Sequence, residues 1–137
     1  MTKEEKYLKW LENAEDDLDT AECMLKLKKY MHTIFMCQQA IEKLAKGIFV
    51  YNFGKEAPYT HNMCIVLKDI EEIISSDEYK NDYEKLFNRL TSHYIIGRYD
   101  VYKQKLSANL NEEETTLIFE KSKEAFLWLK SKVKLSN

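Results

Sequence analysis

The sequence predicts an all-α protein, an up-and-down four-helix bundle with one additional short helix, formed as a single domain over residues 1–137. Three observations favour this fold class. Apolar residues recur at helical spacing through several long segments. Three glycines and one proline are too few for the many turns of a β-sandwich or barrel. The length is that of one domain, and 45% hydrophobic residues suffice for a core.

The first two helices are predicted over residues of about 3–28 and 30–52. An apolar stripe with steps of three and four residues marks the first helix: Tyr7, Leu11, Ala14, Leu18, Ala21 and Leu25. The second helix is apolar around more of its circumference. We therefore expect it to lie centrally in the bundle or at an interface.

The remaining helices follow from caps and breakers. Thr60 is a suitable N-cap for a short third helix over about 61–75. A fourth helix is predicted after residues 75–77 and ends at Gly97, and residues 98–110 are predicted to form an ordered, irregular loop. Asn111 and Glu114 fit a capping box at the start of a fifth helix that extends to about residue 134.

The composition excludes several classes of protein. A net charge of −2 argues against a globally basic nucleic-acid binder, so no DNA partner is predicted, although a local basic patch stays open. No stretch has the roughly 18 apolar residues of a membrane span. Three cysteines without paired spacing indicate a reduced, cytoplasmic setting. His61 and Cys64 are too few ligands for zinc, so neither a metal nor a cofactor is predicted.

Polar residues on the first two helices are candidates for structural contacts. Gln39 and Lys43 lie one turn apart on the second helix, as do Glu42 and Lys46. Because this helix is otherwise apolar, some of these groups should lie at a partly buried seam and need partners from another helix. Asp17 borders the stripe of the first helix. It is either part of a solvated acidic face or paired with a basic residue of a neighbouring helix.

Two arginines are candidates for phosphate chemistry. Arg89 lies one turn before His93 on the fourth helix, where a guanidinium could hold a phosphate while an imidazole moves a proton, as metal-independent RNA cleavage requires. The alternative is a surface arginine and a histidine satisfied inside the bundle. Arg98, beside Tyr99, could contact a phosphate or stack on a base. Equally, it could bind helix carbonyls or Asp17.

Four segments together resemble the HEPN domain family (higher eukaryotes and prokaryotes nucleotide-binding). Trp10-Leu11-x-x-Ala14-x-x-Asp17-Leu18-x-x-Ala21 is similar to the first helix of that family, and Gln38-Gln39-Ala40-x-Glu42-Lys43-x-x-Lys46 to its second-helix signature. Pro58-x-Thr60-His61-Asn62 resembles its Thr-His turn. Tyr94-x-x-x-Arg98-Tyr99 resembles its Arg-Tyr-Pro segment, with Asp100 in place of proline. The resemblance covers nearly the whole chain.

The resemblance implies a helical bundle that forms homodimers and is often encoded beside a minimal nucleotidyltransferase in a toxin–antitoxin-like pair. It also implies nucleotide or RNA binding. We expect Arg98, Tyr99, Lys43 and His61 to be binding residues and Asp17, Gln39 and Glu42 to be structural ones. Some members are metal-independent ribonucleases with an Arg…His signature. Arg89 and His93 are the catalytic candidates, although the three residues between them are fewer than that signature has.

These observations leave three alternative functions. The first is a module that binds a nucleotide, RNA or a nucleotidyltransferase partner. The second is a metal-independent ribonuclease toxin that uses Arg89 and His93. The third is a non-catalytic structural or assembly dimer in which Arg98 and Asp17 brace the fold.

Overall fold

The structure, a computed structural model, describes residues 1–96 and 110–135. Over these residues the chain is helical and contains no strand, which confirms the predicted all-α bundle. The elements are α1 (Lys3–Lys26), α2 (Tyr30–Phe53), α3 (Met63–Asp69), α4 (Glu71–Ile74), the π-helical turn η1 (Tyr79–Tyr83), α5 (Glu84–Ile96) and α7 (Glu112–Lys130). None of the described helices is both long enough and apolar enough to cross a membrane.

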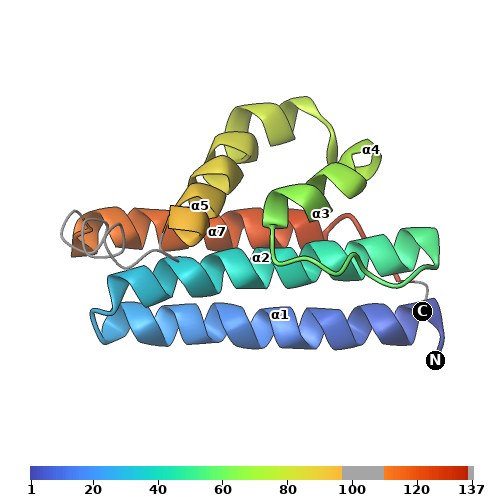
Figure 1. Ribbon diagram of the computed structural model, residues 1–137, viewed down its shortest axis with the longest axis horizontal. Coiled ribbons are helices and arrows are strands. Elements are labelled where there is room, and N and C mark those ends of the chain that lie inside the picture. Colours follow the sequence, from blue (N-terminus) through green and yellow to red (C-terminus); the bar gives the residue numbers. More distant parts are fainter. Residues whose placement is uncertain (97–109, 136–137) are drawn as a thin grey trace.

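Three long helices lie side by side, and the rest of the chain is inclined across them. Figure 1 shows α1 and α2 running antiparallel, with α7 along the other side of α2 in the same direction as α2. The segment from α3 to α5 stands at a steep angle to these helices and packs against α2. Lys28, in the left-handed region at φ 60°, lies at the reversal from α1 into α2.

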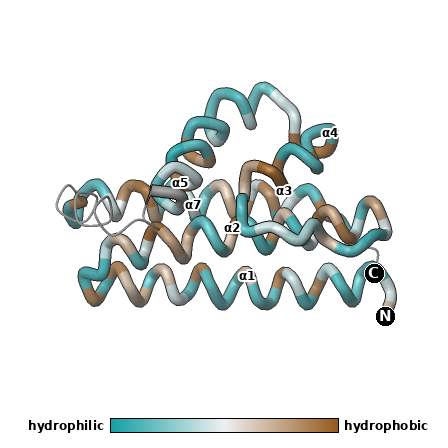
Figure 2. Tube along the Cα trace, viewed as in Figure 1, coloured by the Kyte–Doolittle hydropathy of each residue, from teal (hydrophilic) through white to brown (hydrophobic). Residues whose placement is uncertain are grey.

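The second helix is the centre of the core, as its wide apolar surface predicts. Its fully buried side chains include Ile34, Ile41, Leu44 and Ile48. In contrast, α1 alternates between polar and apolar residues along its length in Figure 2, and it buries one stripe. Because α1, α3, α5 and α7 all contact α2, its wide apolar surface is covered within one chain.

The third helix begins later than predicted. Asn62, not Thr60, is its N-cap: the Asn62 side chain accepts a hydrogen bond of 3.0 Å from the Cys64 backbone N–H. The Thr60 hydroxyl instead accepts from the Asn62 N–H. The carbonyls of Thr60 and His61 face α2, where side chains bind them, so they do not begin the helix. The predicted helix over about 61–75 is therefore wrong at its start, and it is divided into α3 and α4.

The fourth helix starts at Asp77 and continues into the π-helical turn η1. The Ser76 hydroxyl accepts from the Tyr79 backbone N–H, which caps this start. Tyr79 and Tyr83 then pack against Trp128 of α7, with ring centroids 5.9 Å and 4.8 Å from that indole. This aromatic cluster joins the inclined segment to the long helices.

The last helix has the predicted N-cap Asn111, but the carboxylate of Glu114 pairs with Arg89, and the helix ends four residues early. The Asn111 side chain accepts from the Glu114 backbone N–H at 2.7 Å, and α7 ends at Lys130 rather than at about residue 134. The predicted end at Gly97 lies outside the described residues, as does the predicted loop except for its last residue, Leu110.

Candidate functional site

The two candidate catalytic residues lie on one face of α5, but the arginine has a protein partner. Arg89 forms an ion pair with Glu114 of α7, and both side chains are exposed. His93 is half-buried, and its Nδ1 atom has no hydrogen-bond partner among the described residues. Burial, and then the charge of Arg89, lower the pKa of the His93 imidazole below its ordinary value. A half-buried histidine with a lowered pKa thus lies beside a guanidinium that a carboxylate already holds.

Arg98 and Tyr99, the candidate phosphate and base contacts, lie outside the described residues.

Asp17 joins α1 to α2. Its Oδ2 atom lies 2.8 Å from the Lys43 ammonium, and the Gln39 amide donates to the same oxygen at 3.1 Å. The Asp17 side chain is only 13% exposed and that of Lys43 29% exposed. Lys43, a predicted binding residue, thus has its charge engaged by a carboxylate of the same chain.

The opposite edge of α2 holds the turn before α3. The Lys46 ammonium lies 3.0 Å from the Glu42 carboxylate and donates to the Thr60 carbonyl at 2.6 Å. The Gln38 amide donates to the His61 carbonyl at 3.4 Å. His61 itself is exposed, and its Nδ1 atom lies 3.5 Å from Glu42. This predicted binding residue therefore stands at the surface above a buried carboxylate.

Both edges of α2 carry residues of the segment Gln38–Lys46. Gln39 and Lys43 face α1, whereas Gln38, Glu42 and Lys46 face the turn at 60–62. Glu42 and Lys46 are buried, which places them in the partly buried seam expected from the sequence. The polar residues on one edge of α2 thus bind α1, and those on the other edge bind a loop.

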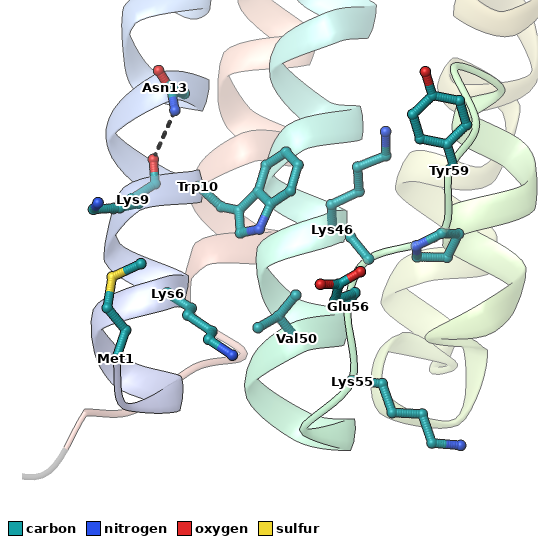
Figure 3. A pocket seen from close by; sticks show the side chains of 12 residues that line it. Met1, Lys6, Lys9, Trp10, Asn13, Lys46, Val50, Lys55, Glu56 and Tyr59 are labelled. Carbon is teal, nitrogen blue, oxygen red and sulfur yellow. Dashed lines mark hydrogen bonds between the residues drawn. The ribbon is translucent and has the colours of Figure 1, made fainter.

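A pocket of about 560 Å³ opens beside this turn, between α1, the end of α2 and the segment that follows α2. It is lined by Met1, Lys6, Lys9, Trp10, Asn13, Lys46, Val50, Lys55, Glu56, Ala57, Pro58 and Tyr59. Figure 3 shows the Trp10 indole reaching from α1 toward α2, with Lys6 pointing inward below it and Lys9 and Lys55 at the outer edges.

The position of Trp10 depends on a close approach of the two helices. A Cβ atom added to Gly47 would lie 2.8 Å from the Cβ atom of Trp10, closer than nonbonded atoms allow. The absence of a side chain at Gly47 therefore lets α1 approach α2 at the level of Trp10. The Lys46 ammonium lies 5.8 Å from the centre of the indole.

The pocket is positively charged. Four lysines and one glutamate line it. Lys46 is compensated by Glu42, whereas Lys6, Lys9 and Lys55 have no ion-pair partner within residues 1–96 and 110–135. An aromatic wall with unpaired cations suits a ligand that is flat at one end and anionic at the other.

Sequence reasoning missed this pocket. Its only residue among the predicted contacts is Lys46, because Lys6, Lys9 and Lys55 read as ordinary surface lysines. One signal was present. Trp10 precedes Leu11 directly and so lies on the border of the apolar stripe, where a large aromatic residue is partly covered and partly available.

In the described parts of the chain, no group of three or more His, Cys, Asp and Glu side chains is placed to hold a metal ion. Cys64 instead lies 3.1 Å from the Thr91 hydroxyl.

The fold and site define a helical-bundle protein with a cationic, aromatic-walled pocket. A family model for the HEPN domain matches residues 7–132, and the chain therefore belongs to the HEPN family. Comparisons with curated proteins and with solved structures gave no match. Membership of this family supports, at a coarse level, a module that binds nucleotides or RNA.

Proposed function

We propose that this HEPN protein acts as a non-catalytic module that binds a nucleotide or RNA. The observation that carries the proposal is the pocket beside Trp10, in which an indole lies together with three lysines that pair with no carboxylate in the described part of the chain. Aromatic rings bind nucleobases by stacking, and lysines bind phosphates. The candidate catalytic guanidinium of Arg89 is paired with Glu114 in the structure, so a scissile phosphate would first have to displace that carboxylate.

The test is a binding assay with a panel of nucleoside phosphates and short single-stranded RNAs, in chelator and at several salt concentrations. We expect binding that weakens as salt rises, since each lysine–phosphate contact releases counterions. Absence of binding by every member of the panel at low salt would remove the proposal and favour the third function, a structural or assembly dimer.

The module is further proposed to be a homodimer and to pair with a minimal nucleotidyltransferase, as the HEPN half of a toxin–antitoxin-like system. The exposed apolar side chains Ile65, Leu117 and Leu127 are available for such contacts. Light scattering at micromolar concentration tests the dimer. Co-purification with the product of a neighbouring nucleotidyltransferase reading frame tests the pair.

A metal-independent ribonuclease is the second candidate, and the Nδ1 atom of His93, which has no hydrogen-bond partner among the described residues and lies beside Arg89, favours it. The ion pair that holds Arg89 is exposed, so its separation costs only about 0–1 kcal/mol. The test compares RNA degradation in chelator by the wild type and by His93→Ala, with Ser92→Ala as the matched control on the exposed side of α5. Cleavage that only His93→Ala abolishes would establish this candidate, and equal, negligible cleavage by all three would exclude it.

A further inference from the structure

We infer that the pocket beside Trp10 binds one nucleotide at a time, with the base against the indole and the phosphates on Lys6 and the rim lysines Lys9 and Lys55. The inference rests on the proposed function and names its site and ligand class. The ligand must have one nucleobase and at least one phosphate group. Such a ligand is either a free nucleotide or the phosphorylated end of an RNA chain.

The size of the pocket favours one nucleotide. A volume of about 560 Å³ lies within the range of small-molecule sites. Sites for longer single strands offer successive aromatic platforms along a basic groove. Here the one indole stands between α1 and α2, and the backbone of residues 55–59 closes the opposite side.

The four lysines around Trp10 differ in whether they are free to bind a phosphate. Lys46 is already bound to Glu42 and to the Thr60 carbonyl, so it is a positioning residue for the pocket wall rather than a phosphate ligand. Among residues 1–96 and 110–135, no carboxylate forms an ion pair with Lys6, Lys9 or Lys55, so none has to be displaced before these lysines contact a phosphate. Because Figure 3 shows Lys6 as the one that points inward, it should contribute most.

More phosphate groups should give tighter binding. We expect affinity to fall from ATP to AMP to adenosine, since charge-assisted hydrogen bonds are about twice as strong as neutral ones. Glu56, the single acid among the lining residues, does not cancel the charges of Lys6, Lys9 and Lys55.

The experiment titrates ATP, AMP, adenosine and a 5′-phosphorylated RNA oligonucleotide into the protein and follows tryptophan fluorescence and calorimetric heat. The chain has two tryptophans, and Trp128 is buried, so quenching by a base should come from Trp10. The variant Trp128→Phe should retain the quenching. Trp10→Ala should lose it and weaken ATP binding about 5- to 150-fold, because stacking on an aromatic ring contributes on the order of 1–3 kcal/mol per base.

The lysine variants provide a test that does not disturb the helix packing. Lys6→Gln should weaken ATP binding about three- to tenfold and leave adenosine binding unchanged, since only the phosphates contact lysine. Lys123→Gln, an exposed lysine on α7 away from the pocket, is the matched control and should change neither affinity.

The RNA arm separates the two sources of the ligand. If 5′-phosphorylated RNA binds more tightly than ATP, and ATP displaces it, the natural ligand is a chain end in the same pocket. RNA binding that ATP does not displace and Lys6→Gln does not weaken would overturn the inference while leaving the proposed function in place. Failure of every nucleotide and RNA to bind would overturn both.

Discussion

Lys46 and Thr60 join the central helix to the turn before α3: the Lys46 ammonium donates a 2.6 Å hydrogen bond to the Thr60 carbonyl while it also pairs with Glu42. A lysine from the second-helix segment of the family resemblance thus holds the backbone of the Thr-His turn. The two segments are distant in sequence and adjacent in space. This contact also fixes the wall of the pocket beside Trp10.

Removal of Lys46 should destabilise the protein markedly. Its side chain is 10% exposed and that of Glu42 4% exposed, so Lys46→Met leaves a buried carboxylate without its main cation. Breaking a buried pair in this way costs roughly 3–5 kcal/mol. The measurement is urea-induced unfolding, together with proteolysis of the segment 54–62.

An exposed pair of the same spacing provides the control. Glu22 and Lys26 are also four residues apart, with side chains 45% and 74% exposed. Lys26→Met should change the free energy of unfolding by less than about 0.5 kcal/mol. Equal effects of the two substitutions would contradict the role assigned to Lys46.

Gly47→Ala should force α1 and α2 apart. The added Cβ would lie 2.8 Å from the Cβ of Trp10, whose position the backbone of α1 fixes. We expect a net loss of about 1–2 kcal/mol, because the strain outweighs the better helix propensity of alanine. Thermal unfolding measures this loss. Trp10→Ala retains the Cβ atom and should not rescue the variant, so a full rescue would indicate that another contact is responsible.

The Asp17–Lys43 pair should couple α1 to α2 measurably. The two atoms lie 2.8 Å apart and both side chains are largely covered. A double-mutant cycle with Asp17→Asn and Lys43→Gln should give a coupling free energy of about 1 kcal/mol, at the upper end for ion pairs that solvent still reaches. Additive effects of the two substitutions on the unfolding midpoint would show that the pair contributes nothing.

His93 should make the protein less stable in mild acid. Its pKa is lowered in the folded protein, by burial and by the Arg89 charge, so the unfolded chain binds a proton more readily. The stability contributed by the neutral imidazole is present above the ordinary histidine pKa and is lost as the pH falls through the lower, folded value. Unfolding free energies at about pH 7.5 and 5.5 should therefore differ more for the wild type than for His93→Gln. The opposite order would contradict the lowered pKa.

Cys37 should react with thiol reagents only when the protein unfolds. Burial raises the pKa of its thiol to about 12, whereas Cys23 is exposed. At about pH 8 the buried thiolate is almost absent, so native protein should be labelled at Cys23 and not at Cys37. Mass spectrometry of labelled peptides, with and without denaturant, measures this. Labelling of native Cys37 as fast as that of Cys23 would indicate frequent opening of the core.

The sequence by itself determined the helices with strong apolar periodicity. The stripe from Tyr7 to Leu25 and the wide apolar surface of α2 predict α1 and the central helix closely, since the 3.6-residue period is a local property of the chain. The N-cap Asn111 could also be predicted from the local sequence. The start of α3 was not, because side chains of α2 bind the carbonyls of Thr60 and His61 and delay the helix to Met63.

Only the tertiary structure decided which polar groups meet. The sequence indicated that polar residues of Gln38–Lys46 need partners. It did not indicate that Asp17 would pair with Lys43, or that a loop carbonyl would bind Lys46. The pocket beside Trp10 was likewise hidden, since its lysines come from separate segments that periodicity cannot bring together. The hydrophobicity of a residue predicts its burial from the local sequence alone. Contacts between polar side chains depend on how the helices cross, and the crossing is set only when distant segments pack together.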